Sequence, residues 1–510
     1  MTTYRTPDVY IEEISVFPPS VAEVETAIPA FIGNTQKAER TAAGDLTNKP
    51  TKIYSFKEYE QYYGFANTEA ITITVVDDGN GGFKTQDFKV SGNTPGNTTL
   101  PTHLLYYAVK MYFDNGGGLC YIVSVGNYAA APALGASGLT PSGILGGIDA
   151  LSLEDEPTLI VIPEAVKLNA ADYATVSQAV LKQCGRLGDR FGIFDVRDGG
   201  ADLNSPDGAT TLLDTNRKAF GANNLKYGAL YYPFVRTSLA WFALNGDKTK
   251  VTVTFPAAPA PAAGAGAGAG GAGGGGAGGG AGGGAAAATT TTGTLNTIET
   301  SNTAVFNAVK GALAEQYIIM PPSGAVAGVY AATDTARGVW KAPANVSLAD
   351  VIEPVVRLDN AHQDDLNVDS TGGKSINAIR SFAGKGTLVW GARTLAGNDN
   401  EWRYISVRRF FNMVEESVKK STYWAVFEPN DANTWVKVRG MIENYLTQKW
   451  REGALAGATT KDAFFVRCGL GTTMSSADIL EGRMNVEIGM ATVRPAEFII
   501  LKFSHKLQTS

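Results

Sequence analysis

Residues 401–430 read EWRYISVRRFFNMVEESVKKSTYWAVFEPN, and the C-terminal third of the chain is organised around them. Apolar residues recur there every three or four positions, which predicts a helix with one buried face. These residues are Tyr404, Val407, Phe411, Val414 and Val418. The expected opposite face is charged, with Arg408, Arg409, Glu415, Glu416, Lys419 and Lys420. That face is interpreted either as a solvated surface or as a docking surface for another protein. Residues 425–427 then predict a strand that ends at Pro429.

The overall composition favours a large chain that is not a nucleic-acid-binding protein. A length of 510 residues favours about three domains. Hydrophobic residues make up 44% and charged residues only 18%, which fits a surface largely covered by neighbours. A net charge of −6 argues against nucleic acid as the main partner. Three scattered cysteines predict no disulfide framework, and no secretory signal or run of about 18 apolar residues is found. We therefore expect synthesis and assembly in the cytoplasm and no membrane insertion.

Both ends of the chain carry a short strand-forming segment isolated by prolines. Residues 9–14 lie between Pro7 and Pro18, and residues 498–503 follow Pro495. The apolar members are Val9, Tyr10, Ile11 and Ile14 at one end, and Phe498, Ile499, Ile500, Leu501 and Phe503 at the other. Such a segment has little core of its own and needs a sheet edge. It is either an ordinary strand of its own domain or an arm that adds a strand to a neighbouring subunit.

The middle of the chain alternates strands with helices. Apolar runs at 120–125, 158–162 and 191–196 predict buried strands, and residues 104–113 and 170–184 predict helices. This alternation favours a mainly parallel sheet covered by helices.

Two segments interrupt this pattern. DGNGG at 78–82 lies between alternating strands, which predicts a β-hairpin within residues 65–100. Residues 257–288 are nearly pure Ala, Gly and Pro, and they predict a flexible loop without a core.

Motifs that suggest catalysis or ligand binding are incomplete. GGKS at 372–375 lacks the first glycine of a phosphate loop, because Val368 stands there. GTTMS at 471–475 is similar to a serine-protease motif but has Thr473 at the nucleophile position. The histidines are too far apart in the sequence for a metal cluster: His103, His362 and His505. We expect no catalytic residue, no cofactor and no metal.

Several motifs together carry a resemblance to a known family. They are RGVWKAPAN at 337–345, INAIR at 376–380, VWGARTL at 389–395, WRYISVRR at 402–409, VFEPN at 426–430, GALAG at 453–457, AFFVRC at 463–468 and PAEFI at 495–499, with residues 4–14 at the N-terminus. In these motifs the chain resembles the tail sheath protein of contractile injection systems. That family spans contractile phage tails, R-type pyocins and extracellular injection particles.

The resemblance implies a structural subunit and not an enzyme. Hexameric rings stack helically around an inner tube, and contraction drives the tube through a target envelope. The implied partners are other copies of the chain, the inner tube protein, and baseplate and terminal cap proteins. The particle is phage tail-like and can be released extracellularly. Two alternatives remain: a contractile phage virion tail sheath, and a monomeric α/β hydrolase-like enzyme.

The resemblance also implies a multidomain α/β and α+β fold. A subtilisin-like α/β middle domain would occupy 21–64 and 101–345, with the hairpin inserted at 65–100 and the Gly/Ala-rich loop at 256–290. An α+β inner assembly domain would span 346–493, with extended β arms at 1–20 and 494–510. The arms would exchange strands with other copies. We further hypothesise that Arg408, Arg409, Lys419 and Lys420 face the tube.

Overall fold

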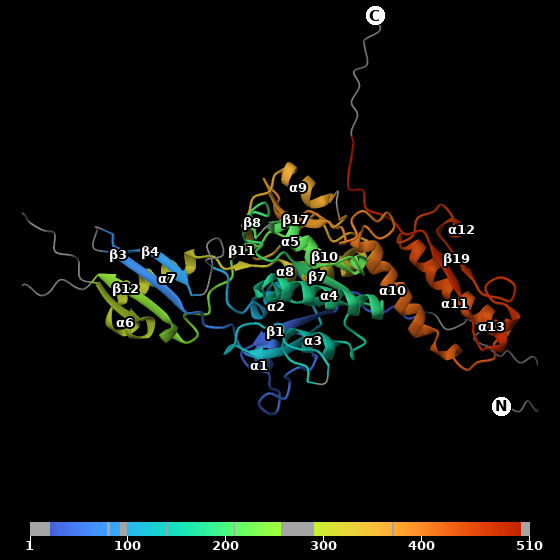
Figure 1. Cartoon of the computed structure of the whole chain (residues 1–510), viewed down its shortest axis with the longest axis horizontal. Helices are drawn as coiled ribbons and strands as arrows, with labels where there is room; N and C mark the ends of the chain where they lie inside the picture. Colours follow the sequence, from blue (N-terminus) through green and yellow to red (C-terminus); the bar gives the residue numbers. More distant parts are fainter. Residues whose placement is uncertain are drawn as a thin grey trace, which may run out of the picture.

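The computed structural model describes residues 21–78, 82–91, 99–138, 140–208, 210–256, 290–369 and 372–500. These residues form an elongated molecule with a small sheet module at one end, a central α/β body, and a helical C-terminal lobe at the other end (Figure 1). The fold is therefore mixed α/β with several sheets, as the sequence predicts. In the described part of the chain, every helix is too short or too polar to span a bilayer.

A nine-stranded sheet forms the centre of the body, in the order β15-β18-β17-β10-β7-β6-β1-β5-β2. Pairing is parallel from β17 to β5, which confirms the predicted mainly parallel sheet. The strands are β1 (Pro29–Thr35), β2 (Thr51–Ile53), β5 (Cys120–Asn127), β6 (Leu159–Val161), β7 (Phe191–Asp195), β10 (Gly228–Tyr232), β15 (Val346–Ser347), β17 (Ile376–Phe382) and β18 (Gly386–Val389).

Helices cover both faces of this sheet, as parallel strands require. On one face lie α1 (Phe56–Tyr63), α2 (Leu105–Asp114) and α8 (Ser323–Arg337). On the other lie α3 (Gly143–Leu151), α4 (Ala170–Leu187) and α5 (Leu212–Ala219). Neighbouring β1 residues divide between the two cores: Phe31 belongs to the first and Ile32 to the second, because strand side chains alternate.

The predicted hairpin is present as β3 (Ile71–Asp77) and β4 (Phe83–Val90), but it is not isolated. It shares a four-stranded sheet with β12 (Val251–Pro256) and β13 (Thr290–Thr294), in the order β13-β12-β3-β4. Helices α6 (Leu295–Ser301) and α7 (Thr303–Glu315) complete this module (Figure 1). Residues 257–289, which the sequence predicts to be a loop, lie outside the described residues.

Smaller elements complete the body. A three-stranded sheet joins β11 (Val235–Thr237), β14 (Ile319–Met320) and β16 (Val351–Pro354), and a two-stranded ribbon joins β8 (Pro206–Asp207) and β9 (Thr210–Thr211). Helix α9 (Asn360–Asn367) packs beside β17.

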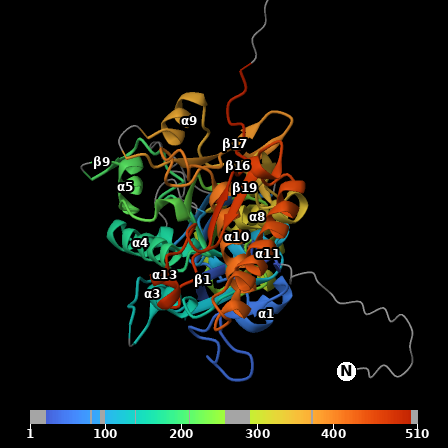
Figure 2. The same cartoon turned by 90° about the vertical axis from the view of Figure 1, so that its right-hand side faces the viewer.

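The C-terminal lobe consists of two long helices and a small hairpin sheet (Figure 2). Its elements are α10 (Ile405–Ser421), α11 (Ala432–Arg451), α12 (Thr460–Ala463), α13 (Ser476–Leu480), β19 (Phe464–Arg467) and β20 (Glu487–Met490). The helix predicted within residues 401–430 is thus confirmed as α10, and the Asp431 carboxylate caps α11 by accepting the Thr434 N–H at 2.9 Å.

The strand predicted at residues 425–427 is wrong. The chain leaves α10 through a 3-10 turn (Tyr423–Ala425), and Phe427 takes a positive φ of 70°. Val426 and Phe427 are exposed, and residues 425–427 belong to no sheet of the described lobe. Apolar composition gave the wrong signal, because here it belongs to an exposed turn and not to a strand.

Candidate assembly site

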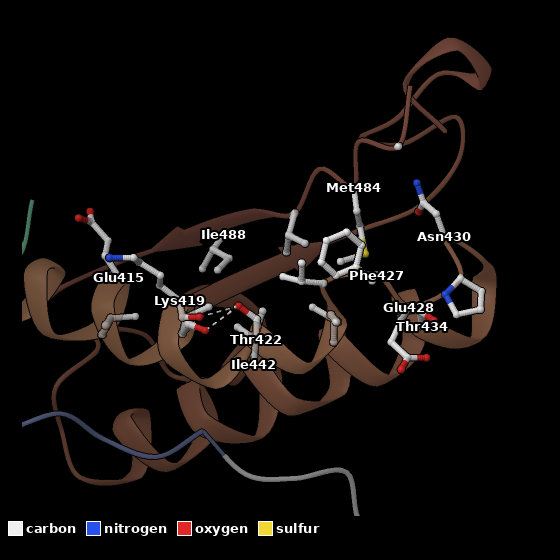
Figure 3. A pocket seen from close by; sticks show the side chains of 18 of the residues that line it. Glu415, Lys419, Thr422, Phe427, Glu428, Asn430, Thr434, Ile442, Met484 and Ile488 are labelled. Atoms are coloured by element: carbon white, nitrogen blue, oxygen red, sulfur yellow. Dashed lines mark hydrogen bonds between the residues drawn. The ribbon is translucent and has the colours of Figure 1, made fainter. Parts of the chain in front are cut away.

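An open apolar groove of about 880 Å³ runs through the C-terminal lobe (Figure 3). Its walls are α10, α11, the 422–430 turn and the chain from 482 to 490. The apolar lining residues are Phe411, Val414, Val418, Val426, Phe427, Val438, Ile442, Met484, Val486, Ile488 and Met490. An apolar cleft of this size on the surface of the lobe is a candidate binding site for another apolar element.

The sequence builds this groove from two periodicities. Phe411, Val414 and Val418 follow helical spacing along α10, and they line the groove as the predicted apolar face. Ile488 and Met490 lie two residues apart on β20, so both side chains point to the same face. The apolar face of α10 was predicted as a buried face, but the groove itself was not predicted. The alternation of Val486, Ile488 and Met490 is the signal that indicates its β20 wall.

The strand beside the groove has an available edge. Within the described residues, β20 pairs with β19 alone, from Glu487 opposite Arg467 to Met490 opposite Phe464. A two-stranded sheet is marginal by itself, and its edge is a template for a further strand. The lobe therefore presents a strand edge directly beside the apolar groove.

Arg409 is not on a solvated or docking face, contrary to the prediction. Its guanidinium is 3% exposed and pairs with Asp334 of α8, at 3.0 Å for Nη1–Oδ1 and 2.5 Å for Nη2–Oδ2. It also donates to the Thr26 carbonyl at 2.9 Å and lies 4.7 Å from the centre of the Tyr330 ring. The reason is that α10 packs on both sides, so its second face contacts the α/β body.

Arg408 is likewise buried, at 2% exposure. It lies over the Trp402 ring at 4.3 Å and donates to the Asn412 side chain at 2.7 Å and to Glu415 at 3.0 Å. Glu415 therefore pairs with Arg408 and not with Lys419, the partner that helical spacing suggests. In the described chain neither arginine is available to contact a tube.

The two lysines of the same prediction remain at the surface. Lys419 is 54% exposed and pairs with Glu416 at 3.1 Å. Lys420 is 32% exposed; it pairs with Asp155 of the body at 2.7 Å and with Glu416, four residues earlier on α10, at 3.4 Å.

The N-terminal arm lies outside the described residues, but the segment that follows it does not. The backbone N–H of Ala22 donates to Ser421, and that of Val24 donates to Ser417, both hydroxyls of α10. Glu23 pairs with Lys449 of α11 at 2.5 Å. Any arm preceding residue 21 therefore starts from the C-terminal lobe.

The C-terminal arm is described only to residue 500. Phe498, Ile499 and Ile500 are 72%, 79% and 80% exposed and belong to no strand of their own chain. Three consecutive exposed apolar side chains are unfavourable in water, which supports a covered state in an assembly. The remaining predicted arm residues, Val9, Tyr10, Ile11, Ile14, Leu501 and Phe503, lie outside the described residues.

The position where open α/β sheets usually bind ligands is filled by the chain itself. The strand order reverses between β1 and β6, and such switch points form crevices at the strand ends. Here the fully buried Glu164 carboxylate accepts the Asn34 N–H at 2.8 Å and the Leu104 N–H at 3.2 Å. The Glu164 side chain thus fills this end of the sheet.

The motifs that sequence analysis rejected have structural partners. Thr473 donates its hydroxyl to the Asn485 carbonyl at 2.7 Å, and Lys374 donates to the Arg217 carbonyl at 2.7 Å. His362 lies 2.6 Å from Asp359, and His103 lies 3.7 Å from Glu164; His505 lies outside the described residues. In the described ranges, no three His, Cys, Asp or Glu side chains gather as a metal site would require.

Comparison with known proteins gives the class of this assembly. Residues 279–395 match the phage tail sheath protein central domain, and residues 397–506 match the phage tail sheath C-terminal domain. The tail sheath protein of Vibrio phage KVP40 is 30% identical over 131 residues, and that of Enterobacteria phage T4 is 28% identical over 130. Each alignment covers 25% of this chain and 19% of the relative, so the chain spans about a fifth of those curated relatives' length.

Solved structures match over the whole chain. The chain is similar to the contracted sheath complex of the extracellular contractile injection system PVC, at 28% identity and a TM-score of 0.60, with 99% of each chain covered. It is equally similar to the contracted helical sheath of the anti-feeding prophage, at 28% identity and a TM-score of 0.59, covering 99% of this chain and 100% of that one.

These matches define the class as a structural protein of contractile tails. Over residues 279–395 and 397–506 the chain matches the two domains of the phage tail sheath protein, which is a structural protein and not an enzyme.

Proposed function

We propose that this chain polymerises as hexameric rings stacked helically around an inner tube, and that the polymer contracts to drive the tube through a target envelope. The observation that carries the proposal is the whole-chain likeness to sheath subunits of contracted injection systems. A baseplate structure solved with six-fold symmetry contains a chain that is also 28% identical, which supports hexameric rings and a baseplate partner. Further proposed partners are the inner tube protein and a terminal cap protein.

Strand addition is the proposed bond between subunits. The arms at 1–20 and 494–510 would each lay a strand beside β20 or β19 of another copy and place apolar side chains into the groove. Main-chain hydrogen bonds supply affinity in this mode, and pockets for alternate side chains supply specificity. Because side chains alternate along a strand, Phe498 and Ile500 of the C-terminal arm would lie on one face and could both pack into the apolar groove.

Rigid-body motion is the proposed route of contraction. The buried Arg409–Asp334 pair and the Lys420–Asp155 pair tie α10 to the body, so that lobe and body rotate together. The arms would act as hinges and keep their backbone hydrogen bonds while the lattice changes.

Contact with the tube is proposed for the two lysines Lys419 and Lys420. Arg408 and Arg409 are withdrawn from this role, because both are buried within the chain. Lys419 is the better candidate since its side chain is the more exposed of the two lysines.

A toxin-delivery particle is favoured over the alternative, a phage virion tail. The injection-system sheaths match this chain from end to end, whereas the virion proteins match only a quarter of it. The particle would be assembled in the cytoplasm and released extracellularly. Neighbouring genes provide the discriminating observation: toxin and ATPase genes support delivery, and capsid and lysis genes support a virion.

Negative-stain electron microscopy of the purified chain tests the proposal. The intact chain of 53.7 kDa should form striated tubes, and a variant lacking residues 1–15 should remain a folded monomer of correspondingly lower mass. Long sheaths from the truncated chain would refute arm exchange. An intact chain that stays monomeric at high concentration would refute self-assembly.

A further inference from the structure

We propose that Arg393 is a positioning residue. It binds Glu497, near the start of the C-terminal arm, and thereby directs the arm away from its own subunit's groove. The proposal rests on the proposed function, since it concerns which copy the arm pairs with. An arm tethered beside its own groove has an effective concentration on the order of millimolar. Without a device that prevents it, the arm would cover its own groove and block assembly.

The Arg393 guanidinium binds the Glu497 carboxylate through two hydrogen bonds, and this bidentate contact is called the clamp below. Arg393 donates from Nε to Glu497 Oε1 at 2.9 Å and from Nη2 to Oε2 at 2.5 Å. The arginine side chain is 5% exposed and the glutamate side chain 22% exposed. Bidentate arginine–carboxylate pairs are strong and fix orientation as well as distance.

Two further donors hold the same carboxylate. Asn367, at the end of α9, donates from Nδ2 to Glu497 Oε1 at 3.3 Å, and Tyr404 donates its hydroxyl to Oε2 at 3.3 Å. The Asn367 carbonyl also accepts from Arg393 Nη1 at 3.0 Å. Glu497 is therefore held from three side chains, more than a solvated glutamate in an extended tail requires.

The backbone of the arginine is fixed to the central sheet. Asn377 of β17 accepts the Arg393 N–H at 2.8 Å and donates to the Arg393 carbonyl at 2.8 Å. The same Asn377 amide donates to the Leu230 carbonyl of β10 at 3.2 Å. The clamp thus shares the rigidity of the body.

The chain has little freedom between the lobe and the clamp. Val493 still donates its N–H to the Ala454 carbonyl of the lobe at 3.3 Å, so residues 494–496 alone span the gap to Glu497. Three residues reach roughly 10 Å when extended. Past the clamp, residues 498–500 run outward on the side of α9 and away from β19 and α13 (Figures 1 and 2). The exposed apolar residues are therefore presented to a second copy.

The test is Glu497→Gln, which keeps the shape of the side chain and removes its charge. Spin labels on cysteines introduced at Ile500 and at Ala361 of α9 report the direction of the arm, and the three native cysteines are buried. The intact clamp should give a narrow distance distribution, and Glu497→Gln a broad one. The critical concentration for sheath formation should rise about tenfold, which corresponds to about 1.4 kcal/mol.

Two controls keep the result interpretable. Glu481→Gln removes an exposed partner of Arg483 in the same lobe and should change neither readout. Glu497→Asp keeps the charge on a shorter side chain and should fall between the two. A narrow distribution or an unchanged critical concentration in Glu497→Gln overturns the clamp. Normal sheaths from a variant lacking residues 494–510 overturn the arm itself, and hence the proposed function.

Discussion

Removing Asp334 should destabilise the protein far more than removing a surface carboxylate. The Arg409 side chain is 3% exposed, and Asp334→Ala removes the carboxylate that pairs with it. Breaking a buried pair from one side typically costs about 3–5 kcal/mol. The Thr26 carbonyl and the Tyr330 ring still contact the cation, so we expect the lower end, about 3 kcal/mol. That corresponds to roughly a hundredfold in the unfolding constant.

Urea unfolding followed by tryptophan fluorescence measures this change. Glu353→Ala is the matched control: its pair with Arg236 is 45% and 30% exposed, so we expect a loss under about 1 kcal/mol. The double variant Asp334→Ala/Arg409→Met should recover most of the stability, because no unpaired charge stays buried. An Asp334→Ala loss equal to that of the control would refute the assignment of Arg409 to the interior and would return it to the tube-facing candidates.

Three further predictions concern packing, protonation and the tube. Gly324→Ala should lower the free energy of unfolding by about 1–3 kcal/mol in a urea titration, because its Cβ would lie 2.4 Å from the Ala108 carbonyl oxygen. Gly311→Ala, with open space around it, should raise the free energy of unfolding by roughly 0.5–1 kcal/mol. Equal effects of the two substitutions would contradict the close packing of α2 on α8. Burial raises the pKa of Asp195 to about 7, so the folded chain holds a proton that the unfolded chain loses near pH 4. The free energy of unfolding should therefore fall as pH rises from about 4 to 7, and Asp195→Asn should remove that part of the pH dependence. An unchanged slope of unfolding free energy against pH in Asp195→Asn would contradict this assignment. Lys419→Glu should lower the yield of sheath-covered tube without changing thermal unfolding, and an unaltered yield would exclude Lys419 from the tube contact.

The sequence predicted those elements in which local pattern and tertiary packing agree. The strands β5, β6 and β7 and the helices α2, α4 and α10 have strong local patterns, and their positions are confirmed within a few residues.

The errors arise where long-range packing overrides the local pattern. Helical spacing assigned Arg408 and Arg409 to a solvated face, since a single-helix pattern does not show that α10 packs on two sides. Their partners, Asp334 and Trp402, lie outside α10, and one of them is 75 positions away. The groove was not predicted for the same reason: its α10 wall was expected to be buried, and its β20 wall belongs to a short strand after a long turn.

A cryo-electron microscopy reconstruction of the polymer tests the central claim most directly. The account predicts main-chain hydrogen bonds between residues 498–503 or 9–14 of one copy and the β19–β20 sheet of another, with apolar arm residues seated in the groove. A polymer in which each groove is empty, or is filled by its own chain's terminus, would contradict the account.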